Sequence, residues 1–84
     1  MNWDVTDVSI IEHLVLSVRF ADGTVGEVQF MPEHLTGVFA PLKNSDFFAE
    51  VYVNEGAVAW PNDIDLAPDA IYQAIKKHGR WVLK

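Results

Sequence analysis

The chain has 84 residues, with twelve Asp and Glu against six Lys and Arg, three His and no Cys, and its formal charge is −6 at pH 7. A chain of this length forms one domain with a modest core, and the lack of Cys excludes disulfides, thiolate metal sites and cysteine nucleophiles. No apolar run approaches the roughly 20 residues of a membrane-spanning helix. We therefore expect a cytoplasmic protein without membrane contact.

Alternating apolar and polar residues over residues 5–30 predict three antiparallel strands, each with one buried face. The first turn is expected at Glu12 and His13. The second is expected at residues 21–24, where an Asp-Gly pair supplies the positive φ that tight hairpin turns require. These strands form a meander.

Two short helices are predicted after the meander. A proline suits the first turn of a helix over residues 32–35. Residues 38–42 are too apolar for a solvated loop, so we expect them to cross over the sheet. Asn44 or Ser45 can cap the second helix, over residues 46–50, because their side chains accept hydrogen bonds from free backbone N–H groups.

A second hairpin and the clearest helix follow. Residues 51–53 and 57–60 are predicted to be strands joined by a glycine turn. Apolar residues at helical spacing predict a helix over residues 68–78, with Gly79 as its left-handed cap. Residues 79–84 are a basic C-terminal tail that can form a last short strand.

Together these elements predict a single α+β domain over residues 1–84. Its sheet is mostly antiparallel, built from a three-strand meander and a second hairpin, with short helices and one C-terminal helix. Residues 1–75 contain all twelve acids but only two of the Lys and Arg, a charge of −10, whereas residues 76–84 contain the other four and no acid, a charge of +4. The sequence thus places a basic end on an acidic body.

Four groups of residues, spread over most of the chain, form a combination specific enough to compare with known families. They are Phe-Ala-Asp-Gly at residues 20–23, Val-Phe-Ala-Pro-Leu at residues 38–42, Phe-Phe at residues 47–48 with Val51, and Trp-Pro-Asn-Asp-Ile-Asp-Leu-Ala-Pro-Asp at residues 60–69 with Tyr72. With these residues the chain resembles the small bacterial family known as domain of unknown function 2442. It differs at Asp63, where the family commonly has Gly, but Asp also tolerates the left-handed region.

This resemblance implies a compact α+β domain in a family without an established catalytic activity. It also implies an antitoxin-like role, because members tend to be encoded beside a small toxin-like protein. The implied partner is a small basic protein that the acidic body would mask.

Catalytic motifs are missing from the sequence. No serine lies in a Gly-x-Ser-x-Gly elbow, the glycines are too dispersed for a phosphate loop, and the histidines at positions 13, 34 and 78 lack the spacing of a helical metal site. We therefore predict no catalytic residue, no bound metal and no cofactor.

One pair of carboxylates keeps an enzymatic alternative open. Asp63 and Asp65 could supply oxygen ligands or acid–base groups, although aspartates in turns and at helix starts usually accept hydrogen bonds from the backbone. A small-ligand-binding protein or weak hydrolase using Asp63, Asp65 and a histidine is the first alternative.

The tryptophans are assigned to different roles. Trp60 is predicted to fill the core against the final helix, through Ile71 and Ile75. Trp81 lies beyond the last helix cap and is predicted to be a surface anchor for a partner.

The sequence therefore favours a non-enzymatic module that binds another protein, with an acidic surface facing a basic partner. The candidate partner-binding residues are Glu27, Glu50, Asp63, Asp65 and Trp81. A second alternative is contact with nucleic acid through the basic end, although a charge of +4 is small. Its residues are Lys76, Lys77, Arg80 and Lys84. Free strand edges also allow a homo-oligomer.

Overall fold

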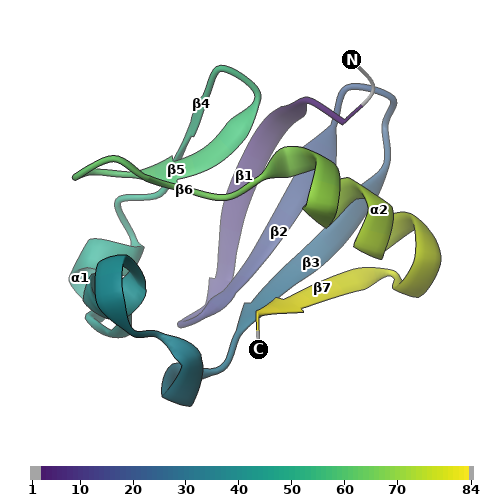
Figure 1. Cartoon of the computed structure of the whole chain (residues 1–84). Coiled ribbons are helices and arrows are strands. Elements are labelled where there is room, and N and C mark those ends of the chain that lie inside the picture. The colour runs from purple at the N-terminus through teal and green to yellow at the C-terminus, as the bar shows by residue number, and fades with distance from the viewer. Residues whose placement is uncertain (1–2, 84) are drawn as a thin grey trace.

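Two sheets share one core in the computed structural model, which describes residues 3–83 (Figure 1). The larger sheet has the order β1-β2-β3-β7, with β1 Val5–Glu12, β2 Val15–Phe20, β3 Val25–Phe30 and β7 Arg80–Leu83. The smaller has the order β4-β5-β6, with β4 Tyr52–Asn54, β5 Ala57–Trp60 and β6 Ile64–Asp65. All pairings are antiparallel except that of β3 with β7. The predicted α+β class, with its meander and second hairpin, is confirmed.

Three of the four helices lie within two residues of their predicted bounds, but the sequence does not predict the 3-10 helix over residues 37–43, where it indicates only a segment that crosses over the sheet. The 3-10 helices η1 Pro32–His34 and η2 Gly37–Lys43 and the α-helices α1 Ser45–Phe48 and α2 Pro68–His78 follow in chain order. The Asn44 side chain caps α1 by accepting hydrogen bonds from two backbone N–H groups, and Gly79, with φ +82°, ends α2. Within residues 3–83 no helix has the length and apolarity needed to cross a bilayer.

The first turn of the meander lies one residue later than predicted. It consists of His13 and Leu14, and Leu14 adopts φ +69°, a conformation that costs a non-glycine residue energy. The Leu14 side chain is only 8% exposed, and its carbonyl accepts a hydrogen bond from the Phe30 N–H. Burial of the Leu14 side chain and the hydrogen bond of its carbonyl therefore outweigh the energetic cost of the left-handed backbone conformation.

The sequence predicts no strand between residue 60 and the last helix, but Ile64 and Asp65 form β6. Asn62 and Asp63 both adopt left-handed conformations, with φ +70° and +62°, so the chain turns back and pairs β6 with β5. Asp63 thus adopts the left-handed conformation that the sequence predicts for it.

The basic C-terminal segment is part of the sheet rather than an appendage. Its residues 80–83 form β7, which α2 brings back beside β3 in parallel register, with Arg80 opposite Glu27 and Trp81 opposite Val28. Lys84, the last residue of the predicted tail, lies outside the described residues.

The core lies between α2, one face of the larger sheet, and the smaller sheet (Figure 1). Trp60 is fully buried, as predicted, in the same cluster as Ile71 and Ile75 of α2. Its ring lies close to those of Phe30 and Phe48, with centroids 5.9 and 5.8 Å away. The Trp60 Nε1–H donates a 2.9 Å hydrogen bond to the Phe48 carbonyl, so the one polar atom of the ring is also satisfied.

Candidate functional site

An acidic side is formed by the middle of the chain. Residues 44–75 contain six Asp and Glu and no Lys, Arg or His. They build α1, the smaller sheet and the greater part of α2. The smaller sheet contacts β1, at the opposite edge of the larger sheet from β7 (Figure 1). We call this region, with exposed Glu50, Asp63 and Asp65, the acidic side.

Strand pairing brings these three carboxylates to one small sheet. The start of β4 lies beside the end of β5, which pairs with the start of β6. Glu50, just before β4, and Asp63, just before β6, therefore lie at the same end of the sheet. Asp65 is in register with Ala59, which is in register with Tyr52, and the Tyr52 ring is 45% exposed. The acidic side thus also carries an accessible aromatic ring.

The other two predicted partner-binding residues lie elsewhere. Glu27 is exposed on β3, between Ser17 of β2 and Arg80 of β7, on the face of the larger sheet opposite the core. Trp81 is half-buried rather than a free surface anchor, because β7 pairs with β3 and its ring contacts Phe30 edge-on, with centroids 6.4 Å apart. The structure therefore does not unite the five predicted residues in one surface.

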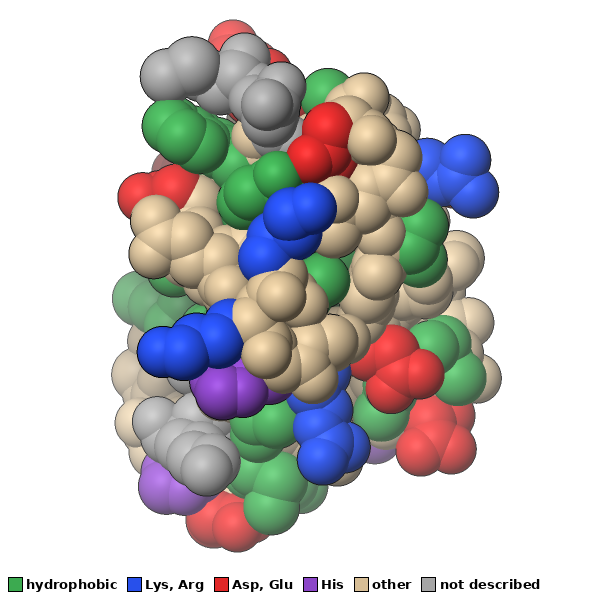
Figure 2. Space-filling model, turned by 90° about the vertical axis from the view of Figure 1, so that its right-hand side faces the viewer, with side chains coloured by type: hydrophobic (Ala, Val, Ile, Leu, Met, Phe, Trp, Pro, Cys, Tyr) green, Lys and Arg blue, Asp and Glu red, His purple; other side chains and the backbone are tan. Residues whose placement is uncertain are grey.

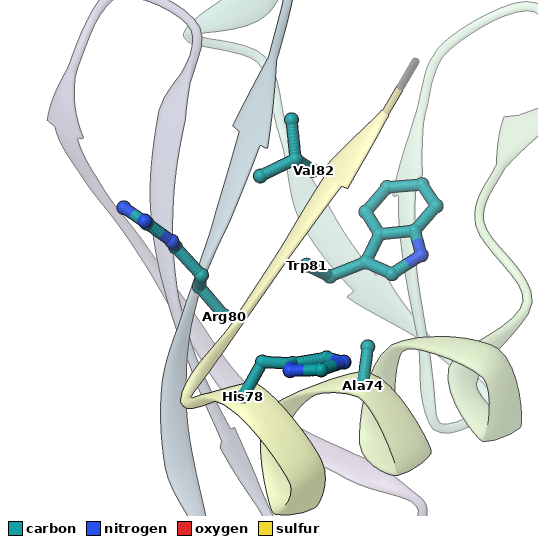
Figure 3. A pocket seen from close by; sticks show the side chains of 5 residues that line it. All are labelled: Ala74, His78, Arg80, Trp81 and Val82. Atoms are coloured by element: carbon teal, nitrogen blue, oxygen red, sulfur yellow. The ribbon is translucent and has the colours of Figure 1, made fainter.

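A basic side lies where α2 ends and β7 begins. Figure 2 shows Lys, Arg and His side chains gathered on this side of the molecule. Lys76, Lys77, His78 and Arg80 are all exposed. A pocket of about 610 Å³ opens beside them (Figure 3). Its lining residues are Ala74 and His78 from α2 and Arg80, Trp81 and Val82 from β7. The sequence revealed the charges but not the pocket, which depends on the position of β7.

A hydrogen-bonded pair fastens α2 to the β2–β3 turn. The Tyr72 O–H donates to Asp22 Oδ2 at 2.5 Å, and Asp22 Oδ1 accepts from the Thr24 N–H at 2.9 Å. The bond from Tyr72, followed by those from Thr24, lowers the pKa of Asp22 from 3.8 to about 2, and the Asp22 carboxylate raises the pKa of Tyr72. Lys76 Nζ lies 5.7 Å from the centre of the Tyr72 ring. This pair positions α2, and with it the basic side.

Replacement of Tyr72 by Phe is expected to make the fold less sensitive to acid. A carboxyl whose pKa is lower in the folded than in the unfolded state stabilises the fold above its unfolded pKa and loses this effect as the pH falls towards its folded pKa. For Asp22 this window runs from about pH 4 down to about pH 2. We expect Tyr72→Phe to unfold at a lower temperature than the wild type at pH 7. On acidification its unfolding temperature should fall by less than that of the wild type.

Thermal unfolding followed by circular dichroism at pH 7, 4 and 2 tests this expectation. Tyr52→Phe is the matched control, because the Tyr52 side chain is exposed on another sheet. If Tyr72→Phe and the wild type lose equal stability between pH 4 and pH 2, the bond to Asp22 does not set its pKa.

The histidines and the Asp63–Asp65 pair lie on different elements. His13, in the β1–β2 turn, has Nε2 3.0 Å from the Lys43 carbonyl oxygen, and His34 and His78 lie in η1 and at the end of α2. Over residues 3–83, no group of three or more Asp, Glu and His side chains has the arrangement of a metal site. The geometry lends no support to the alternative that uses these carboxylates with a histidine.

A family model matches most of the chain. The model of a family described as "Protein of unknown function (DUF2442)" matches residues 5–77. No curated protein and no solved structure matches the chain. The matched segment spans β1 to the last turn of α2 and leaves β7 outside it.

Proposed function

We propose that this chain, which belongs to the DUF2442 family of proteins of unknown function, is a non-enzymatic module that binds another protein. The proposal rests on the charge and the side chains of its surface. In this proposal the acidic side receives a basic partner and masks its charge. An antitoxin-like protein that covers a small basic toxin-like protein would work in this way.

The uniform charge of the acidic side is the observation that supports this function. Six acids without a single base in residues 44–75 create a negative potential that steers a positively charged protein towards this side. Exposed Tyr52, in the same cross-strand row as Asp65, supplies the aromatic anchor that protein interfaces favour. Charge would then govern the rate of association, and the aromatic ring the lifetime of the complex.

Charge reversal on the acidic side is expected to slow association by tenfold or more. The tagged protein is used to recover its partner from native cells, and association is then followed by stopped-flow fluorescence at several salt concentrations. We expect Glu50→Lys with Asp65→Lys to slow the reaction and to reduce its dependence on salt, because exposed charges are screened beyond about 8 Å at physiological ionic strength.

The matched control is Glu27→Lys with Glu33→Lys. This variant changes the net charge equally, at exposed positions on β3 and η1. It is expected to bind almost as fast as the wild type. Equal slowing in both double variants, or association that salt does not affect, would contradict the proposal.

A further inference from the structure

We propose that the groove between β7 and the C-terminal half of α2 accepts an extended acidic segment of a partner protein as an additional strand. This site lies on the basic side, and of the residues that line its pocket only Ala74 belongs to the segment that forms the acidic side.

The outer edge of β7 is available for pairing. β7 is the last strand in the order β1-β2-β3-β7, so within residues 3–83 no strand lies beyond it. Its inner edge pairs with β3. In a strand at the edge of a sheet, alternate residues direct their N–H and C=O groups outwards, where another chain can pair with them. An extended segment laid along β7 would satisfy these groups.

The shape of the pocket matches this mode of binding. Figure 3 shows Trp81 directed to the α2 side of β7, whereas Arg80 and Val82 leave the strand on the other face. A pocket lined by residues from both faces of one strand must pass around its edge, where an added strand would lie. Ala74 and Trp81 can then contact the side chains on one face of the bound segment, and Val82 can contact those on its other face.

Charge identifies the segment as acidic. Residues 76–83 carry Lys76, Lys77, His78 and Arg80 and contain no acid. All four are exposed, and His78 and Arg80 line the pocket. Glu27 lies beside Arg80 on the outer face of the sheet, so the positive potential is strongest on the α2 side. A peptide is favoured over nucleic acid because only a peptide backbone offers the N–H and C=O groups that pair with a strand.

A synthetic peptide of alternating valine and glutamate, carrying a fluorescent label, is the probe. Fluorescence anisotropy with the full chain should show saturable binding, and hydrogen exchange should show slower exchange of the β7 amides in the complex. We expect Ala74→Trp, which fills the groove without changing charge, and Lys76→Glu with Lys77→Glu to weaken binding by tenfold or more each. Arg19→Glu with Lys43→Glu, at exposed positions on β2 and η2, changes the net charge by the same amount as the double lysine variant and should change binding less than twofold.

A second form of the probe keeps the proposal testable without altering the protein. The same peptide with methylated backbone nitrogens keeps its charge but cannot donate the ladder hydrogen bonds, and it should bind tenfold or more weakly. Equal binding of both peptides would overturn the proposal, since the charge of the peptide alone would then explain its binding. So would unchanged exchange of the β7 amides, absence of binding, or tighter binding of a single-stranded DNA oligonucleotide that displaces the peptide.

Discussion

Trp60→Ala is expected to destabilise the protein by roughly 3 to 5 kcal/mol, the usual loss for removing a large aromatic ring from a core. The Trp60 ring is fully buried beside those of Phe30 and Phe48, which also lie next to each other, and its loss leaves a cavity in this aromatic cluster. The loss also removes the closer of the two donors to the Phe48 carbonyl, the other being the Val51 N–H. Because small domains are stable by only about 5 to 15 kcal/mol, much of the protein should unfold at moderate urea concentrations.

Urea denaturation followed by far-ultraviolet circular dichroism measures this loss. Trp81→Ala is the matched control: the same side chain is removed from a half-buried position, and the loss should be smaller. Trp60→Phe should be intermediate, because it keeps an aromatic ring but leaves the Phe48 carbonyl with only its longer hydrogen bond, 3.3 Å from the Val51 N–H. If Trp60→Ala keeps the wild-type midpoint and loses only affinity for a partner, Trp60 belongs to a binding site.

Gly26→Ala is expected to destabilise the protein by about 1 to 3 kcal/mol, the range for overpacking a core. A Cβ at Gly26 would lie only 2.5 to 2.8 Å from the side-chain carbons of Ile75. Ile75 is buried on α2, so it has little room to move, and the helix itself would be pushed away from β3. The absence of a side chain at this position is what lets α2 lie close to the sheet.

A double-mutant cycle with Ile75→Ala isolates this contact. Ile75→Ala alone should cost about 2 to 5 kcal/mol, but it also removes the atoms that obstruct the new Cβ. The double variant should therefore be less destabilised than the sum of the single changes, with the free energies of unfolding taken from urea titrations. Strictly additive losses would show that Gly26 and Ile75 do not contact each other in solution.

Part of the candidate site was predictable and part was not. The negative charge of the acidic side and the positive charge of the basic side follow from composition along the chain, because each side is largely built from one continuous segment. Glu27 and Glu50 do not belong to one surface, since Glu27 lies on β3 of the larger sheet and Glu50 in the turn before β4 of the smaller sheet. Trp81 was placed at the surface because its strand partner could not be identified from sequence. The Asp22–Tyr72 bond, which joins residues far apart in the chain, gave no sequence signal.

The elements that sequence alone determined are those whose causes lie within a few residues of each other. The alternation in residues 15–30, the Asn44 cap of α1 and the Gly79 end of α2 are of this kind, and the structure confirms all three. Each depends on backbone sterics, short-range hydrogen bonds or the face that a short segment buries. The buried face predicted for β1 is wrong, because only Val5 of that strand is buried and Ile10 is 40% exposed.

Only the tertiary structure decided the features that depend on pairing between distant segments. The left-handed Leu14, the short strand β6 and the parallel position of β7 are stable because each gains burial or ladder hydrogen bonds from residues elsewhere in the chain. Local preference cannot reveal such gains, since they exist only once the partner strand is in place. The pocket between β7 and α2 is therefore a property of the assembled fold and of no single segment.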